Sequence, residues 1–123
     1  MTPTPGSIGD QVVAAIAAQD RDALARCFAP ECRFRALIPD GLREREGRDP
    51  TADLITRWFA DTTDLQLLDS HADELADRLH IWYRITGVEN SEPYVVEQHL
   101  FGVVRDGAIA SAQLLCSGFR PQR

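Results

Sequence analysis

Four side chains in the second half of the sequence are of types that act on small molecules: Tyr83, Gln98, His99 and Cys116. A glutamine amide donates and accepts hydrogen bonds and a tyrosine hydroxyl donates one, so both can orient a ligand carbonyl or hydroxyl. A cysteine thiolate is a nucleophile where a neighbouring base or cation lowers the pKa of the thiol. A histidine that shares a strand face with a carboxylate, as His99 does with Glu97, can act as an acid or base near neutral pH. These four residues are our candidates for a catalytic role.

Each candidate also has a structural interpretation, which the sequence leaves open. Gln98 can satisfy a buried backbone group, and Tyr83 can be a core aromatic whose hydroxyl reaches the rim of the domain. Cys116 has no basic partner apparent in the sequence, and a free cysteine usually behaves as a small buried hydrophobe. His99 and Glu97 can form a pair on the surface or in an interface.

The candidates lie in segments where apolar and polar residues alternate, which is the pattern of half-buried strands. The pattern predicts three strands there, over 78–88, 93–105 and 108–118. Side chains of successive strand residues point to opposite faces of a sheet. This alternation places Tyr83, Gln98 and Cys116 on the apolar, inner face and His99 on the outer face.

The rest of the chain predicts the elements that surround these strands. Capping residues and a helix-starting proline predict three helices, over 8–18, 21–28 and 50–61, with caps at Ser7, Asp20 and Asp49-Pro50. Further strands are expected over 31–37, 42–48 and 65–75. Helices gathered on one face of a curved antiparallel sheet make an α+β fold.

Three short helices cover only part of the apolar face of such a sheet. We therefore expect a cone-shaped, mostly apolar pocket between the two layers, with a hydrophobic small molecule as its ligand. The predicted lining of this pocket consists of seven residues: Phe34, Ala36, Trp58, Tyr83, Gln98, Leu114 and Cys116.

The length of 123 residues, with 44% hydrophobic and 26% charged residues, suits a single domain. We place this domain at residues 8–119, after a flexible N-terminus at 1–7 and before a C-terminal tail at 120–123. No apolar run approaches the roughly 20 residues of a membrane span, and the first residues lack the pattern of a signal peptide. Together with an odd number of cysteines and no CxxC motif, these features predict a cytoplasmic protein with reduced thiols and no membrane partner.

Charge and composition exclude several classes of function. A formal charge of −6 makes nucleic acid an unsuitable partner, because an acidic surface repels phosphate backbones. All thirteen basic residues are arginines, and without lysine neither Schiff-base chemistry nor a Walker-type phosphate loop is possible. Cys27 and Cys32 have no neighbouring histidine to complete a zinc site, so we expect no metal and no cofactor.

Four stretches of the sequence together resemble the NTF2-like superfamily, and in particular its SnoaL-like members. They are DRDALARCFAPECRFRAL at 20–37, GRDPTADLITRWF at 47–59, ADRLHIWYRITG at 76–87 and VEQHLFGVVRDGAIASAQLL at 96–115. The resemblance extends from about Ser7 to Phe119 and rests on pattern more than on invariant motifs. It implies a curved sheet wrapped around an apolar pocket, and it leaves the activity open because one fold hosts many functions.

Ketosteroid isomerases of this superfamily use a carboxylate base, a tyrosine and a protonated aspartate. The resemblance implies that the corresponding positions in this chain hold Ala36, Val12 and Gln98, respectively. Ala36 cannot take a proton, so the chain departs from that machinery. The inward acid of SnoaL-type cyclases and the Asp-Arg-Asp relay of limonene epoxide hydrolases also have no evident counterpart on the inner face.

Two classes of function remain open. The first is an isomerase, cyclase or dehydratase that acts on a hydrophobic, polyketide- or steroid-like substrate. The second is a non-catalytic protein of the same fold that binds a ligand or a partner. Members of the superfamily often dimerise through the outer face of the sheet, and an apolar patch there supports a homodimer in this case. The predicted face contains His80, Trp82, Arg84 and Phe101.

Overall fold

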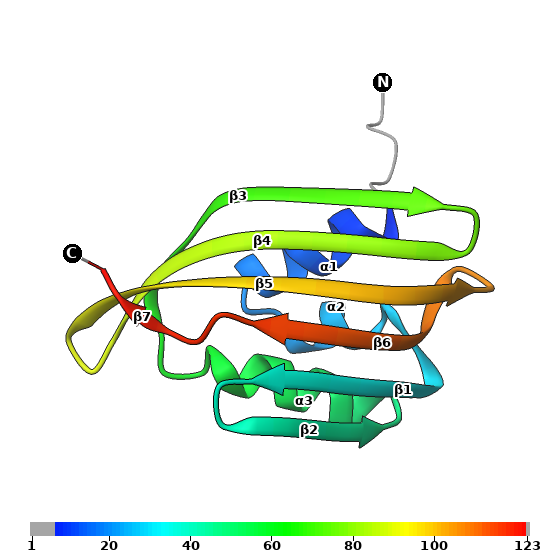
Figure 1. Ribbon diagram of the computed structural model, residues 1–123, viewed down its shortest axis with the longest axis horizontal. Helices are drawn as coiled ribbons and strands as arrows, with labels where there is room; N and C mark the ends of the chain where they lie inside the picture. The colour runs from blue at the N-terminus through cyan, green and yellow to red at the C-terminus, as the bar shows by residue number, and fades with distance from the viewer. Residues whose placement is uncertain (1–6, 123) are drawn as a thin grey trace.

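The computed structural model describes residues 7–122, in which three helices lie against one face of a curved sheet (Figure 1). The elements are α1 (Ile8–Ala17), α2 (Arg21–Ala25), β1 (Phe28–Ile38), β2 (Gly41–Glu46), α3 (Arg48–Trp58), β3 (Thr63–Leu75), β4 (Arg78–Glu89), β5 (Glu92–Arg105), β6 (Ala108–Cys116) and β7 (Arg120–Pro121). The strand order is β2-β1-β6-β5-β4-β3, and β7 pairs with β5. The predicted α+β fold, a curved sheet packed on three helices, is confirmed. Residues 1–6, which we expected to be flexible, lie outside the described residues.

The first two helices begin where their capping residues predict. Ser7 Oγ accepts a hydrogen bond from the backbone N–H of Asp10 at 3.2 Å, at the start of α1. Asp20 Oδ1 accepts from the backbone N–H of Ala23 at 3.0 Å, at the start of α2. Each cap satisfies an N–H group that the first turn of a helix leaves unpaired, which fixes where the helix starts. No helix within residues 7–122 has both the length and the apolar character needed to cross a membrane.

The third helix begins two residues earlier than the sequence predicts. We expected Asp49 to be its N-cap, but α3 starts at Arg48 and its N-cap is Gly47, which has a φ of 100°. Glycine adopts such a positive φ without steric cost. The Gly47 N–H donates to the Cys32 carbonyl at 2.7 Å, which anchors the turn to β1. As a result, the Asp49 carboxylate faces α2 instead of capping its own helix.

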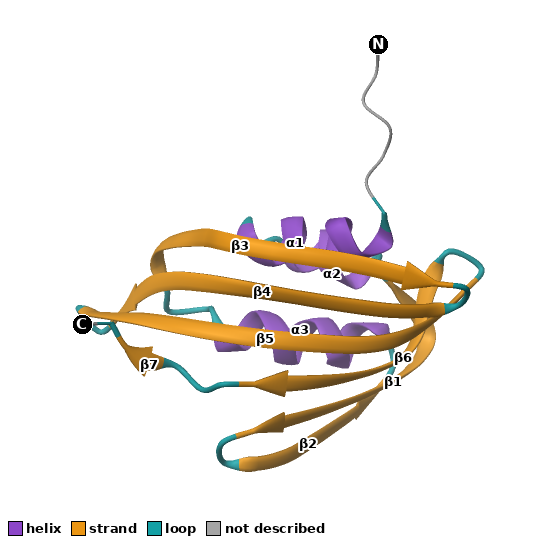
Figure 2. Cartoon of the chain, turned by 45° about the horizontal axis from the view of Figure 1, so that its top comes forward, coloured by secondary structure: helices purple, strands orange, loops and turns teal. Residues whose placement is uncertain are grey.

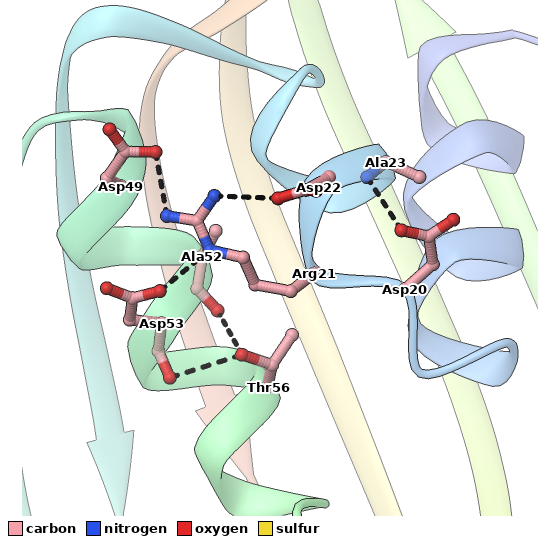
Figure 3. Close-up of polar contacts among 8 residues, drawn as sticks. All are labelled: Asp20, Arg21, Asp22, Ala23, Asp49, Ala52, Asp53 and Thr56. Carbon is pink, nitrogen blue, oxygen red and sulfur yellow. Dashed lines mark hydrogen bonds and ion pairs between the residues drawn. The ribbon is translucent and has the colours of Figure 1, made fainter.

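Arg21 joins α2 to α3 (Figure 3). Its Nη2 lies 2.7 Å from Asp49 Oδ1 and its Nε lies 2.8 Å from Asp53 Oδ1. Its Nη1 contacts Asp22, in its own helix, at 3.1 Å. The hydrogen bonds to Asp53 and Asp49 raise the pKa of Arg21 above its usual value, so the guanidinium is a permanent cation. Three carboxylates around one cation hold the two helices in a fixed relative position.

The sheet is mixed, because one of its strand pairs is parallel. Strands β3 to β6 form the predicted antiparallel meander, and β1 pairs with β2 as an antiparallel hairpin. In contrast, β1 and β6 run parallel, with Phe34 opposite Ala112 and Ala36 opposite Leu114. No short loop joins these two strands, so no hairpin constrains their relative direction. Their pairing places the end of β1 beside the end of β6 (Figure 1).

The two faces of the strands are those that the alternation predicts. The register of β4 with β5 runs without a break from Arg78 opposite Val103 to Glu89 opposite Glu92. On the inner face, α1 covers β3 and β4, whereas α3 covers β1 and β2 (Figure 1), and all three helices lie on the same side of the sheet (Figure 2). The buried inner side chains of β4 and β5 are Leu79, Ile81, Tyr83, Ile85, Tyr94, Val96, Gln98 and Leu100. The residues between them reach the outer face and are at least partly exposed.

The described chain ends in a strand that the sequence does not predict. Arg120 and Pro121, which lie in the expected tail, form β7 and pair with Val95 and Tyr94 of β5. Proline is tolerated there because β7 is a short strand at an edge. Phe119 precedes this strand, and its ring packs on Tyr94 with 4.8 Å between the centroids. The short strand therefore holds Phe119 against the domain.

Candidate functional site

Three candidate residues, which we call the polar chain, are joined by hydrogen bonds on the inner face. The register places Tyr83 of β4 opposite Gln98 of β5, and Gln98 opposite Cys116 of β6. Tyr83 Oη donates to Gln98 Oε1 at 2.5 Å, and Gln98 Nε2 donates to Cys116 Sγ at 3.4 Å. The backbone N–H of Gly118 donates to the same sulfur at 3.4 Å. The alternation predicts the shared face, and the cross-strand register explains why the three side chains meet.

Burial sets the direction of these hydrogen bonds. Tyr83 and Gln98 are both 0% exposed. Burial raises the pKa of the Tyr83 hydroxyl far above its usual value, so the hydroxyl keeps its proton and donates it to the Gln98 oxygen. The amide nitrogen of Gln98 can only donate, and it does so toward Cys116. The hydrogen bonds therefore run in one sense, from Tyr83 to Cys116, and the thiol hydrogen remains to be donated to another group.

A pocket of about 240 Å³, which we call the mouth pocket, opens where the polar chain ends. Cys116 is partly exposed there, and Trp58 at the end of α3 forms part of the wall. The wall is mainly aromatic and aliphatic, with one carboxylate and one thiol. The lining residues are Ile38, Pro39, Asp40, Trp58, Cys116, Gly118 and Phe119.

Two of the seven residues predicted to line a pocket, Trp58 and Cys116, therefore line the mouth pocket. The other five are absent from the lining of the mouth pocket and are at most 1% exposed: Phe34, Ala36, Tyr83, Gln98 and Leu114. Val12, on α1, is also 0% exposed. At the three positions compared with ketosteroid isomerases, Gln98 is consequently the one residue with a polar side chain, and it is fully buried.

Sequence reasoning missed Asp40, Pro39 and Phe119 as pocket residues. Pro39 and Asp40 are turn-forming residue types between two expected strands, and nothing local shows that this turn lies near the C-terminal end of the chain. The parallel pairing of β1 with β6 brings the turn beside Cys116 and Gly118. The approach is close, since a Cβ atom added to Gly118 would lie 2.8 Å from Pro39 Cγ. The pocket could have been located only if the pairing of β1 with β6 had been known.

His99 lies on the opposite face of β5, in a network of polar and aromatic side chains. Its Nε2 is 3.4 Å from Glu97 Oε2, and its Nδ1 is 3.3 Å from His80 Nε2. Arg84 Nη2 donates to Glu97 Oε1 at 3.0 Å, and this contact lowers the pKa of the Glu97 carboxyl. The His80 ring stacks on Phe101 with 4.5 Å between the centroids. The thickness of the sheet thus separates His99 from the polar chain.

The charge of Glu97 orders the hydrogen atoms in this outer network. An ionised carboxylate only accepts hydrogen bonds, so His99 Nε2 is the donor to Glu97. In the neutral His99 ring, Nδ1 then accepts a hydrogen bond from His80 Nε2. The Glu97 carboxylate thus orients His99, and His99 orients His80. No three His, Cys, Asp or Glu side chains among residues 7–122 are placed to hold a metal ion.

Comparison with known proteins identifies the family. The SnoaL-like domain matches residues 10–112, which is most of the chain. The chain belongs to the SnoaL-like family. A comparison of this SnoaL-like protein with curated proteins finds no match.

Several solved structures share the fold of this SnoaL-like protein at low sequence identity. One, of ketosteroid-isomerase-like fold from Catenulispora acidiphila in complex with trimethylamine, is 20% identical, with a TM-score of 0.73 over 90% of this chain and 85% of that one. A proposed polyketide cyclase from Xanthomonas campestris pv. campestris is 22% identical, with a TM-score of 0.72 over 88% and 86%. Another proposed polyketide cyclase, from Streptomyces antibioticus, is 14% identical, with a TM-score of 0.71 over 89% of each chain. These similarities establish the fold, and the activity has to be inferred from the residues of the site.

Proposed function

We propose that this SnoaL-like protein binds a small, mostly apolar molecule in the mouth pocket. The observation that carries the proposal is the position of the pocket, whose apolar walls surround the sulfur on which the buried polar chain converges. Ligand pockets are usually lined by apolar side chains with a few placed polar groups. The volume of about 240 Å³ lies below the roughly 300–1,000 Å³ of pockets for drug-sized ligands, which favours a molecule of one or two rings.

The polar chain supports a ligand that carries a hydrogen-bond acceptor. Gln98 and Gly118 both donate to the Cys116 sulfur, so the thiol hydrogen is the donor that remains for a ligand. A thiol is a weak donor, and a ketone oxygen is a suitable acceptor for it. The expected ligand is a ketone with one or two rings, whose oxygen faces Cys116 and whose rings contact Trp58 and Phe119.

A matched pair of probes tests this proposal. Naphthyl methyl ketone carries the carbonyl, whereas ethylnaphthalene has nearly the same shape without an acceptor. Binding is expected to quench Trp58 fluorescence and to raise the melting temperature. The fluorescence is measured in the Trp82→Phe variant, in which Trp58 is the one remaining tryptophan. Cys116→Ala is expected to lower the affinity for the ketone to that for the hydrocarbon, a loss of about 2- to 10-fold.

Substitutions on the two faces of the sheet provide the controls. Trp58→Ala and Phe119→Ala are expected to weaken the binding of both probes, whereas Trp82→Ala, on the outer face, should leave it unchanged. If neither probe binds, or if both bind the Trp58→Ala/Phe119→Ala variant as tightly as the wild type, the mouth pocket is not the ligand site.

A second candidate function is isomerisation or cyclisation of such a ketone, and Asp40 at the mouth pocket favours it. Its carboxylate can remove a proton from the carbon next to the carbonyl, and the Cys116 thiol can stabilise the resulting enolate oxygen by a hydrogen bond. The proposed polyketide cyclases among the solved structures support this candidate.

Proton exchange separates this chemistry from binding. The wild type is expected to exchange the methyl protons of naphthyl methyl ketone for deuterium faster than buffer does, as followed by NMR. Asp40→Asn should abolish the exchange and keep the binding, while Asp77→Asn, in the turn between β3 and β4, should keep both. If the protein binds the ketone but its methyl protons exchange no faster than in buffer alone, the protein binds this ketone without catalysing proton transfer.

We also propose that two copies pair through the outer face of the sheet. Phe101 and Leu115 on this face are 45% and 47% exposed. The register places Leu115 opposite His99 and His99 opposite Trp82, so large, partly exposed side chains form a continuous row across three strands. Light scattering is expected to give twice the chain mass of 13.7 kDa, and Leu115→Arg should return it to 13.7 kDa. A wild-type mass of one chain would contradict this pairing.

The cysteines support a further proposal, that the protein works in the cytoplasm. Cys27, Cys32 and Cys116 are all free thiols. Burial raises the pKa of Cys27 and of Cys32, which keeps both as unreactive thiols. Alkylation in intact cells followed by mass spectrometry should modify Cys116 as a free thiol, and a disulfide at Cys116 would contradict a reducing location.

A further inference from the structure

The outer face of the sheet carries a hollow that is larger than the mouth pocket, shares Phe101 with the face proposed for pairing, and has no part in ligand binding at the mouth pocket. Its volume is about 530 Å³, and it crosses strands β1, β6, β5, β4 and β3, which lie side by side in Figure 1. Two short side chains, Ser111 on β6 and Val103 on β5, lie opposite each other in its middle. Longer side chains stand on both sides of them, which explains the hollow. We call it the outer groove.

One wall of the outer groove is cationic. Arg33 and Arg35 lie two residues apart on the same face of β1, and both are exposed. The side chain of neither residue makes an ion pair or hydrogen bond with any residue from 7 to 122, although Glu46 and Glu44 are their cross-strand neighbours on β2. Two guanidinium groups without a partner can bind oxygen atoms of a ligand by paired hydrogen bonds.

The charge around the outer groove is opposite to that of the whole chain. Its lining includes three arginines, Arg33, Arg35 and Arg78, and a single acid, Asp73. The third arginine contacts Asp77 at a distance of 3.6 Å, which is long for an ion pair. Within the lining itself, three arginines outnumber one acid, whereas the chain as a whole has a net charge of −6, so the lining favours anions.

The opposite wall of the outer groove is aromatic. His80 on β4 stacks on Phe101 with 4.5 Å between the centroids and 5° between the planes. Because β5 lies between β4 and β6, the other face of the Phe101 ring turns toward β6 and the groove. The contact of His80 with His99 holds the stacked pair in place. A fixed aromatic face beside two cations is a platform for a flat anion.

We propose that the outer groove binds a small organic anion with a flat apolar body, such as an aromatic carboxylate or sulfonate. The anionic group lies between Arg33 and Arg35. The body extends over Ser111 and Val103 and stacks on Phe101. This ligand chemistry differs from that of the mouth pocket, which lies on the other face of the sheet and has no arginine in its lining.

Two fluorescent probes test the proposal. Anilinonaphthalene sulfonate has the flat body and the anion, and phenylnaphthylamine has a similar body without charge. The Arg33→Ala/Arg35→Ala variant is expected to bind the sulfonate about tenfold more weakly and the neutral probe as the wild type does. Higher ionic strength should weaken the binding of the sulfonate alone. Arg43→Ala, which removes one charge from the other face of the same hairpin, should change neither affinity.

Further outcomes decide between the groove and its alternatives. Phe101→Ala is expected to weaken sulfonate binding. An unchanged melting temperature of this variant would show that the exposed Phe101 side chain is not needed for folding. Equal losses in the Arg43→Ala and Arg33→Ala/Arg35→Ala variants would indicate general charge attraction and overturn the proposal. The proposal would also be overturned if the wild-type protein is a dimer that does not bind the sulfonate and that dissociates when Arg33 and Arg35 are replaced. The groove would then be part of the contact between copies.

Discussion

Two neighbouring residue pairs on β4 and β5 point to opposite faces of the same sheet and differ in charge and in exposure to solvent. Tyr83 lies opposite Gln98 on the inner face, and the next pair, Arg84 opposite Glu97, lies on the outer face. The inner pair is neutral and 0% exposed. The outer pair is ionic, at 3.0 Å, with side chains that are 47% and 36% exposed.

The difference shows what solvent does to the value of a polar contact. When an exposed ion pair is broken, water binds both charges, so little stability is lost. When a buried hydrogen bond loses one partner, the remaining group stays desolvated and unpaired. We therefore expect the inner face to determine stability and the outer face to determine association and ligand binding.

The largest effect that separates the two faces is expected from truncation of adjacent aromatic residues. Tyr83→Ala should lower the free energy of unfolding by about 3–5 kcal/mol, because it leaves a cavity in the packed interior. Trp82→Ala, one residue earlier on the outer face, should lower it by only about 1 kcal/mol. Urea unfolding measures both values. Equal losses in the two variants would mean that the outer face is as closely packed as the inner one.

The next effect is expected within the polar chain itself. Tyr83→Phe should cost about 1–3 kcal/mol in the free energy of unfolding, because Gln98 Oε1 loses its donor without access to water. The double variant Tyr83→Phe/Gln98→Leu replaces both partners by apolar groups and should recover most of that loss. Denaturant unfolding of the four proteins in this cycle gives the coupling energy, and additive losses would show that the two side chains act independently.

High pH offers a third comparison, because burial raises the pKa of Tyr83. Its contribution is fully present below the unfolded tyrosine pKa of about 10 and is lost as the pH rises above it toward the folded value. Between pH 10 and 11, the wild type should lose about 1 kcal/mol more than Tyr83→Phe. Tyr94 also has a raised pKa, so Tyr94→Phe measures the part of the pH dependence that comes from that residue. Parallel pH curves for the wild type and Tyr83→Phe would contradict the burial of this hydroxyl.

The smallest effect is expected on the outer face at low pH. Arg84 lowers the pKa of Glu97, so the contribution of this pair is present above the unfolded glutamate pKa of about 4.3 and disappears as the pH falls below it. Glu97→Gln should cost less than about 1 kcal/mol at neutral pH, and salt should reduce the difference from the wild type. Glu74→Gln, on exposed β3, is the matched control. A larger loss, unaffected by salt, would place Glu97 in a buried interface.

The sequence predicts well those features that depend on neighbouring residues. Ser7 and Asp20 cap helices through contacts three residues away, and alternation along β4 and β5 assigns Tyr83 and Gln98 to one face. The start of α3 escaped prediction because the positive φ of Gly47 depends on a hydrogen bond to the distant Cys32. Where a local signal such as Asp49-Pro50 and a contact between distant residues favour different helix starts, the distant contact can determine the start.

The candidate site was predicted less completely for the same physical reason. Alternation indicates that Phe34, Leu114 and Cys116 face inward, but whether an inner position borders a hollow or a packed side chain depends on what the helices place there. Cys116 borders a pocket, whereas Phe34 and Leu114 are buried. The contribution of Asp40 required knowledge of the β1–β6 pair, which no local pattern encodes.

That parallel pair also governs when the domain can form during synthesis. Strand β1 is made early and its neighbour β6 late, with α3 and strands β3, β4 and β5 between them. Until β6 has left the ribosome, β1 has an open hydrogen-bonding edge, and β5 has no partner on its far side. Contacts so distant in the chain slow folding, because a long loop must close before they form. These open edges therefore persist in the nascent protein until its last long strand joins the first strand to the meander.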